Sequence, residues 1–259
     1  MRGGLVMLVA VFGATAFLGT ATPSAPFAAG TLNFQGTLYV NSVPLTQCPP
    51  GAALGATDCR TRTGEALIQG LGSVSEAYIW SLGLGPPTCS GTLARPLATT
   101  GRLIVAAKGE IQVALAPGAQ CVDLEPVRNQ PQTFTITGGT GVYAAASGSG
   151  TVQRALSGDT GTETWTGTLI VPALEFDLTA PTLSGATSKT VLAPKPAKQV
   201  RVTYNVTASD AIDGPVPVTC RPRSGSRLPV GRNVITCEAT DSSANTGRAR
   251  FLITVKKRR

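Results

Sequence analysis

Residues 217–247 read PVTCRPRSGSRLPVGRNVITCEATDSSANTG and carry clear signals for the fold of the second half of the chain. The two cysteines of this stretch, Cys220 and Cys237, lie in short segments rich in β-branched residues, VTC and VITC. Between them come a Ser-Gly-Ser turn at 224–226 and a Pro-Val-Gly turn at 229–231. Short β-type segments interrupted by such turns predict antiparallel strands rather than helices.

The flanking residues extend this pattern. In KQVRVTYNVTASD, residues 198–210, apolar side chains at every second position predict a strand with one buried face. RARFLITVKK, residues 248–257, alternates in the same way and predicts a closing strand. Several short strands with frequent turn signals over residues 178–259 predict an immunoglobulin-like β-sandwich.

Four motifs of this half follow one another in a recognisable order: TAPTLSG (179–185), VTYNVTASDAIDG (202–214), the stretch at 217–247, and FLITV (251–255). In this order they resemble a hyalin repeat (HYR) module. The resemblance implies an immunoglobulin-like fold, a role in extracellular adhesion or interaction, and a disulfide between Cys220 and Cys237. Ser184-Gly185 and Ala249 stand where further cysteines occur in the family, so the resemblance implies no other bridge.

The N-terminus has the features of an export signal. Arg2 precedes an apolar run from Leu5 to Leu18, and small residues follow as far as Ala29. Because the run is short for a membrane-spanning helix, we predict a secretory signal peptide over residues 1–29, with an uncleaved anchor as the alternative. No second apolar run of spanning length follows, so we expect a soluble mature chain that is secreted or bound at the cell surface.

Export to an oxidising compartment favours disulfides among the six cysteines. Sequence alone leaves fifteen connectivities open. Proximity along the chain favours three pairs: Cys48 with Cys59, Cys89 with Cys121, and Cys220 with Cys237.

The chain contains no histidine, which excludes Ser-His-Asp and Cys-His catalysis as well as histidine-ligated metals. Catalysis would then depend on carboxylates, lysine, tyrosine or a backbone site. This composition favours a noncatalytic protein.

The charge of the chain changes sharply near residues 173–181, where prolines interrupt the β pattern. Residues 30–177 hold 7 Lys+Arg and 10 Asp+Glu, a net charge of −3, whereas residues 178–259 hold 14 and 4, a net charge of +10. We therefore predict two all-β domains, an antiparallel β-barrel over 30–175 and the sandwich over 176–259.

The barrel prediction rests on the glycine-rich run FTITGGTGVYAAASGSGTV, residues 134–152. This run is similar to a signature of secreted proteins related to the allene oxide cyclase and dirigent barrels. The resemblance implies a closed barrel of eight antiparallel strands. The interior of such a barrel is either filled by side chains or holds one small ligand, and no active-site residue is carried over from the family.

Two loops of the sandwich carry oxygen-bearing side chains that we expect at the same end of the fold. These residues are Asp210, Asp213, Asp241 and Asn245. Hard oxygen ligands of this kind suit calcium. The alternative is that the same side chains only cap turns of the backbone.

Basic residues of the second half form a candidate surface for an anionic partner. The candidates are Arg221, Arg223, Arg227, Arg232, Lys256, Lys257, Arg258 and Arg259. Acidic cell-envelope polymer, glycan or an extracellular protein would be the partner, and a merely solvated charged surface is the alternative. No motif of specific nucleic-acid recognition accompanies the charge.

The sequence as a whole predicts a secreted or surface-bound, noncatalytic adhesion or interaction protein that uses the basic HYR-like module for contact. It predicts no cofactor, and calcium is the one candidate for a bound metal. The alternative is a barrel that binds or isomerises a small molecule and is tethered by that module.

Overall fold

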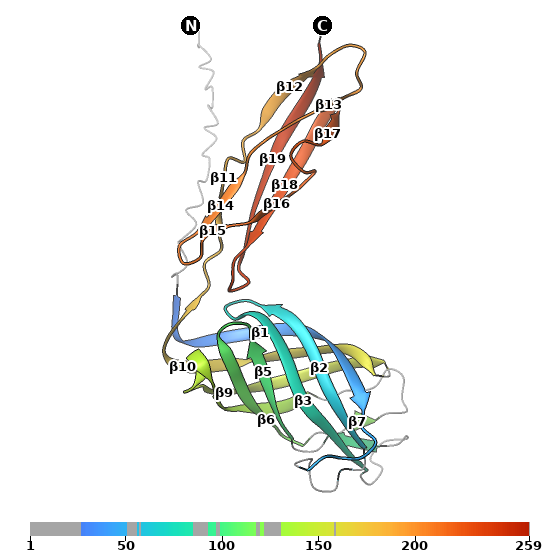
Figure 1. The fold of residues 1–259 in the computed structure, drawn as a ribbon, viewed down its shortest axis with the longest axis vertical. Helices are drawn as coiled ribbons and strands as arrows, with labels where there is room; N and C mark the ends of the chain where they lie inside the picture. The colour runs from blue at the N-terminus through green and yellow to red at the C-terminus, as the bar shows by residue number, and fades with distance from the viewer. Residues whose placement is uncertain are drawn as a thin grey trace, which may run out of the picture.

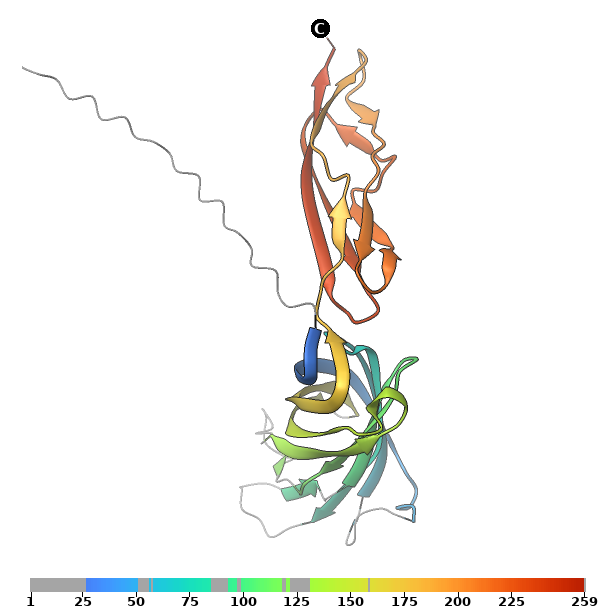
Figure 2. The same ribbon diagram turned by 90° about the vertical axis from the view of Figure 1, so that its left-hand side faces the viewer.

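The computed structural model describes residues 27–50, 56, 58–84, 93–96, 99–117, 120–121, 131–157 and 159–258. The expected signal peptide falls largely on residues 1–26, which lie outside the described residues. A β-barrel and an elongated β-sandwich are joined end to end, as the two views at right angles show (Figures 1 and 2). The described residues include no helix with the length and hydropathy needed to cross a membrane.

The barrel is built from antiparallel strands, in agreement with the sequence prediction. Eight strands close in the order β2-β1-β10-β9-β8-β6-β5-β3, and β3 pairs back onto β2. They are β1 (Phe27–Pro44), β2 (Asp58–Ile68), β3 (Gly72–Leu84), β5 (Thr99–Val105), β6 (Gly109–Leu115), β8 (Gln132–Gly139), β9 (Ser147–Ser157) and β10 (Thr160–Asp177). Two short strands, β4 (Leu93–Pro96) and β7 (Gln120–Cys121), extend the sheet beside β3, and a 3-10 turn, η1 (Gly141–Tyr143), precedes β9.

The glycine-rich signature has a packing role in this barrel. Gly150 on β9 and Gly167 on β10 pair with each other, and a Cβ at either position would collide with the ring of Phe134. Phe134 in turn packs against Trp165, with ring centroids 5.0 Å apart. The two glycines therefore make room for the ring of Phe134, which packs with Trp165 in the barrel core.

The second module is a sandwich, also as predicted. Its central sheet has the order β12-β19-β18-β16, and two smaller sheets, β11-β14-β15 and β13-β17, complete it. The strands are β11 (Thr182–Ser184), β12 (Lys189–Ala193), β13 (Gln199–Arg201), β14 (Thr207–Asp210), β15 (Gly214–Val216), β16 (Val218–Arg221), β17 (Arg227–Pro229), β18 (Gly231–Thr240) and β19 (Thr246–Lys257).

One predicted strand is divided in the structure. The continuous alternation over residues 198–210 becomes β13 and β14, separated by residues without strand pairing. β13 pairs with β17, whereas β14 pairs with β11 and β15, so the chain passes from one sheet to another between them. Val202 and Ala208 stay buried on either side of this crossing, which explains why the sequence alternates without interruption.

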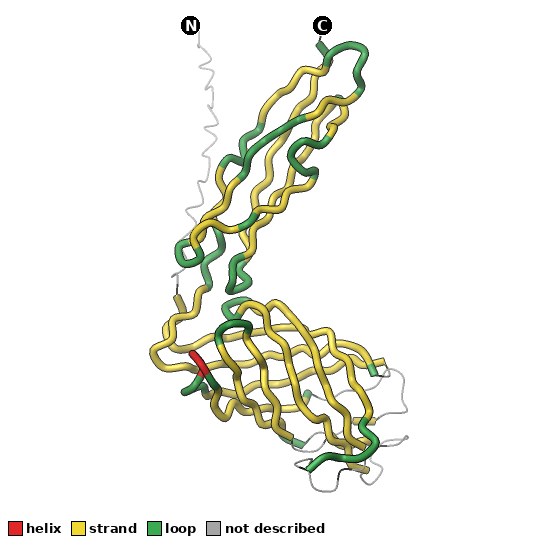
Figure 3. The backbone as a smooth tube through the Cα atoms, in the orientation of Figure 1, coloured by secondary structure: helices red, strands yellow, loops and turns green. Residues whose placement is uncertain are grey.

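Two turns meet where the modules join. The turn between β2 and β3 lies against the turn between β18 and β19, and both are drawn as loops in Figure 3. The Gly70 amide donates to the Ser243 carbonyl oxygen at 2.8 Å, and Lys108 Nζ donates to the Leu71 carbonyl oxygen at 3.0 Å and to Ser243 Oγ at 3.3 Å. The modules are therefore connected by direct hydrogen bonds as well as by the chain that leaves β10.

Candidate functional site

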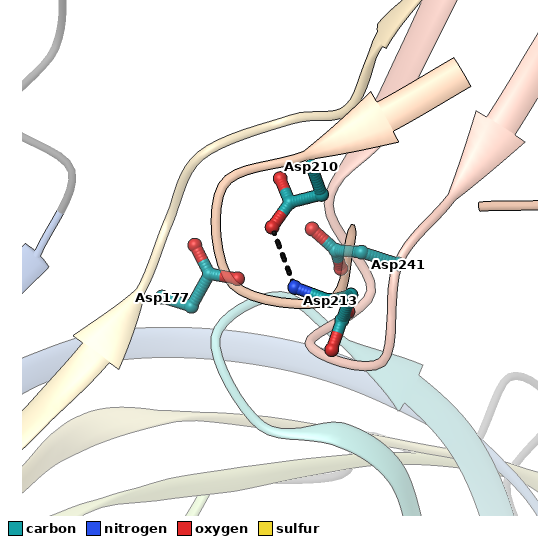
Figure 4. A group of neighbouring side chains, drawn as sticks. All are labelled: Asp177, Asp210, Asp213 and Asp241. Carbon is teal, nitrogen blue, oxygen red and sulfur yellow. Dashed lines mark hydrogen bonds between the residues drawn. The ribbon is translucent and has the colours of Figure 1, made fainter. Parts of the chain in front are cut away.

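Four aspartates converge at the junction between the barrel and the sandwich (Figure 4). They are Asp177, Asp210, Asp213 and Asp241, and one oxygen from each lies within 4.8 Å of one oxygen of every other. Asp177 ends the last barrel strand, Asp210 and Asp213 flank the turn between β14 and β15, and Asp241 follows β18. Three separate segments thus contribute to one cluster.

Turn hydrogen bonds hold these side chains in place. Asp210 Oδ1 accepts from the amides of Ile212 at 2.8 Å and Asp213 at 3.2 Å. Asp241 Oδ1 accepts from the amides of Ser243 at 2.9 Å and Asn245 at 2.8 Å. These are the backbone-capping contacts expected of aspartate in turns, and they account for one oxygen of each carboxylate.

Asp213 connects the two turns. Its carboxylate accepts from the Ser242 amide at 2.7 Å and from Ser242 Oγ at 2.9 Å. The β14–β15 turn and the β18–β19 turn are therefore fixed to each other, which keeps the carboxylates of Asp210, Asp213 and Asp241 close together.

Other oxygens at this point are buried without a donor. Asp177 Oδ2, Asp210 Oδ2 and Asn245 Oδ1 have no hydrogen-bond partner among the described residues. The three residues are only 7%, 6% and 1% exposed. Buried carboxylate and amide oxygens are normally paired, because leaving them unpaired costs free energy. These three oxygens therefore lack a positive or hydrogen-bonding partner in the part of the chain that the structure describes.

The electrostatics of Asp177 agree with this picture. Burial raises the pKa of its carboxyl above the ordinary value, and the negative charges of Asp210, Asp241 and Asp213 raise it further. A hydrogen bond from the Thr179 amide to Asp177 Oδ1, at 2.9 Å, acts in the opposite direction.

Asn245 belongs to the same cluster. Its Nδ2 donates to the Asp177 carbonyl oxygen at 3.1 Å and to Asp241 Oδ2 at 2.9 Å. The structure thus brings together Asp210, Asp213, Asp241 and Asn245, the four candidates chosen from the sequence. It adds Asp177, which ends β10 and which no pattern in the sequence had singled out.

A second group of polar side chains lies inside the barrel and was not indicated by the sequence analysis. Glu163 is fully buried and accepts from Tyr78 Oη at 2.8 and 3.0 Å and from Arg154 Nε at 2.8 Å. Arg62 Nε lies 3.5 Å from Glu163 Oε1, and Arg154 Nη1 donates to Gln132 Oε1 at 2.6 Å. One carboxylate is therefore shared by two buried guanidinium groups.

Glu76 is the second carboxyl of this buried network. Trp165 Nε1 donates to its Oε2 at 3.0 Å, and its Oε1 has no hydrogen-bond partner among the described residues. Burial, followed by the negative charge of Glu163, raises the pKa of Glu76 from 4.5 to about 8. The Glu76 carboxyl is therefore mainly protonated at neutral pH, in contrast to an exposed glutamate.

The candidate basic residues are exposed but do not form one patch. Those within the described residues are all exposed: Arg221, Arg223, Arg227, Arg232, Lys256, Lys257 and Arg258. Arg259 lies outside the described residues. Arg221 pairs with Thr236 in the middle of β18, so it and Arg223 lie midway along the sandwich rather than at its end.

The remaining candidates gather at the end of the sandwich that is far from the barrel, where β13, β17 and the C-terminus lie (Figure 1). Further exposed cations join them there. The distal basic tip, as defined by its described members, consists of Lys195, Lys198, Arg201, Arg227, Arg232, Lys256, Lys257 and Arg258.

Acidic residues of the sandwich have the opposite distribution. Residues 178–259 contain Asp210, Asp213, Glu238 and Asp241 as their acidic residues. Three of these belong to the junction cluster, and Glu238 pairs with Arg248 at 2.9 Å near the same end. The sandwich is therefore negative beside the barrel and positive at its distal tip.

Two of the three favoured disulfides are present, Cys48–Cys59 in the barrel and Cys220–Cys237 in the sandwich. The latter joins directly opposed residues of β16 and β18. The third predicted pair involves Cys89, which lies outside the described residues.

Comparison with known families identifies the second module. Residues 176–255 match the HYR domain, in agreement with the motif order of the sequence. The search of curated proteins found no match to the chain. The HYR domain and the disulfides are consistent with an extracellular protein and indicate an adhesion-type module.

Proposed function

We propose that this is a noncatalytic adhesion or interaction protein that acts outside the cell, and that the distal basic tip binds an anionic polymer of the cell envelope or an anionic glycan. The observation that carries the proposal is the separation of charge along the sandwich. Basic side chains gather at the distal tip. The acidic side chains between residues 178 and 258 lie in the half of the sandwich that is next to the barrel.

The physical reason is that the positive charges of the tip have no acidic neighbours among the described residues to cancel them. Opposed strand residues such as Arg201 and Arg227 place like charges side by side at this end. Such an arrangement is unfavourable for the isolated fold and becomes favourable when a polyanion approaches. Attraction of this kind weakens as salt is added.

The contact surface is also placed where a large partner reaches it freely. The barrel lies at the other end of the long axis (Figure 2). In this arrangement the HYR domain attaches the protein and the barrel is held away from the surface. An acidic face of another extracellular protein would offer the same chemistry as a polymer.

The proposal is tested with the full chain on immobilised heparin, a polyanionic glycan, across a sodium chloride series. A triple variant, Arg227→Gln, Arg232→Gln and Lys257→Gln, removes three charges from the tip. Its matched control, Arg102→Gln, Arg248→Gln and Arg250→Gln, removes three exposed charges elsewhere. We expect the tip variant to bind about tenfold more weakly and with less dependence on salt, and the control to bind like the unmodified chain.

A second function is favoured by the buried network of the barrel. A buried network of titratable groups inside the barrel is typical of a ligand site, and here it consists of Glu76, Glu163, Tyr78 and Arg154. The resemblance to allene oxide cyclase and dirigent barrels points the same way, toward binding or isomerisation of a small molecule. A thermal-shift screen with small polar and apolar compounds tests it, and binding that Glu163→Gln abolishes would support it.

A further inference from the structure

We infer that Asp177, Asp210, Asp213, Asp241 and Asn245 form a calcium site that joins the barrel to the sandwich. This site is separate from the distal basic tip and does not depend on the proposed function. It lies at the junction: Asp177 ends β10 of the barrel sheet, at the start of the region that matches the HYR domain, and the other ligands lie in and beside two turns of the sandwich.

The donor set matches the chemistry of calcium. Each of the four aspartates offers a carboxylate oxygen within 4.8 Å of the others, and the Asn245 amide is hydrogen-bonded to two members of the cluster. Calcium takes six to eight oxygen ligands in a flexible geometry, and carboxylates, amide oxygens and water all serve. Oxygen-only ligands disfavour zinc and copper, which prefer nitrogen or sulfur donors.

Turn capping alone does not explain the arrangement. The capping amides occupy one oxygen each of Asp177 and Asp210, yet the second oxygen of both residues is buried without a donor. Asn245 Oδ1 is likewise unpaired in a residue that is only 1% exposed. A bound cation would satisfy these three oxygens at once.

Protein cations do not fill this role within the described part of the chain. None of the described ion pairs includes any of the four aspartates. Lys108 reaches the junction, but its ammonium group donates to the Leu71 carbonyl oxygen and to Ser243 Oγ. Four carboxylates therefore face one another at short range, and a divalent cation would offset half of their charge.

Calcium at this point would fix the two modules relative to each other. Asp177 ends β10, whose other residues form part of the barrel wall, whereas the remaining ligands lie in two turns of the sandwich. A single ion would thus link three segments that otherwise meet through a few hydrogen bonds. We expect the calcium-free chain to bend more freely at the junction.

The first test is calorimetry of the purified full chain in calcium and in a chelator. At a calcium concentration about 100-fold above Kd, we expect Tm to rise by about 5–10 °C. Titration calorimetry of the folded chain should show one calcium bound. An unchanged Tm together with no heat of binding would overturn the inference, and an equal response to magnesium would contradict the assignment to calcium.

Variants then locate the site. Asp210→Asn and Asp177→Asn keep the size of the side chain and should each weaken calcium binding by about tenfold or more. Glu238→Gln is the matched control, since Glu238 is the acidic residue of the sandwich outside the cluster. Calcium affinity that falls equally in the control would place the ion elsewhere. The calcium titration of the unmodified chain still tests the inference if a variant fails to fold.

Small-angle scattering gives an independent readout of the link between modules. We expect the radius of gyration to be smaller in chelator than in calcium, because bending at the junction shortens an end-to-end molecule. Identical scattering curves in calcium and in chelator would contradict the role of the ion in fixing the modules.

Discussion

Asn245 of the sandwich donates its side-chain amide to the backbone carbonyl oxygen of Asp177, the last residue of the final barrel strand, at 3.1 Å. The same amide group also donates to Asp241 Oδ2 at 2.9 Å. One asparagine therefore ties the end of the barrel to the turn that follows β18. The boundary between the modules is a structured contact rather than a free linker.

This contact predicts a cost for removing the amide. Asn245→Ala should lower the free energy of unfolding by about 2 kcal/mol, because it leaves buried acceptors on Asp177 and Asp241 without their donor. Urea denaturation measures the change. Asn33→Ala is the control, since Asn33 accepts a hydrogen bond from Thr168 at an exposed site and should cost much less. Equal losses in the two variants would contradict a buried role for Asn245.

A second prediction concerns the approach of the two turns. Gly72 has a φ of 99°, and an added Cβ there would collide with the Ser242 carbonyl oxygen across the junction. Gly231 has a φ of 124°, but a Cβ there would meet nothing within 4 Å. Both alanine variants carry backbone strain, so the difference between them isolates the collision.

We expect Gly72→Ala to be less stable than Gly231→Ala by about 2 kcal/mol, measured by thermal or urea unfolding. The Gly72 variant should also show faster proteolysis near the junction. If the two variants are equally stable, the turns do not pack as closely as the structure places them.

The buried network of the barrel predicts a large effect of charge removal. Glu163→Gln keeps the size of the side chain but leaves Arg62 and Arg154 without their shared carboxylate, and should cost about 3–5 kcal/mol. Glu65→Gln, at an exposed position on β2, is the control and should change stability by less than about 0.5 kcal/mol. A Glu163→Gln variant as stable as the unmodified chain would show that this carboxylate does not compensate the two guanidinium groups.

Glu76 predicts a specific dependence of stability on pH. The pKa of the Glu76 carboxyl is about 8 in the folded chain, whereas its ordinary value is 4.5. The folded state therefore keeps a proton that the unfolded chain releases. Between these two values the folded state binds more protons, and the free energy of unfolding therefore falls as pH rises. Glu76→Gln cannot ionise and should flatten this fall, whereas Glu175→Gln, at an exposed position, should preserve it. Urea denaturation at several pH values measures both slopes, and parallel profiles in the two variants would contradict the raised pKa.

The sandwich could be predicted from the sequence because its strands carry local signals. Each signal indicates a strand boundary or a buried face without reference to the rest of the chain. The signals are the turn residues at 224–226 and 229–231 and the alternation of apolar and polar side chains over 248–257. The division of residues 198–210 into β13 and β14 could not be predicted, because side-chain alternation continues through the passage between sheets.

The candidate sites were predictable to different degrees. Oxygen-bearing side chains in and beside turns are conspicuous in the sequence, and loops at one end of a sandwich lie close together. This holds for Asp210, Asp213, Asp241 and Asn245. Asp177 depends on how the barrel meets the sandwich, which no local pattern encodes.

The network around Glu163 depends on closure of the barrel. A charged residue in an alternating strand is ordinarily expected to face solvent. Only the position of Glu163 two residues before Trp165, on the same face of β10, indicates that it points inward.

The most direct test of the proposed function is the salt concentration at which the distal-tip variant, with Arg227, Arg232 and Lys257 changed to glutamine, leaves immobilised heparin. Attachment through the distal basic tip predicts that it elutes at clearly lower salt than both the unmodified chain and the charge-matched control at Arg102, Arg248 and Arg250. Elution of the tip variant and the control at the same salt concentration would contradict attachment through the tip and would attribute retention to net charge alone.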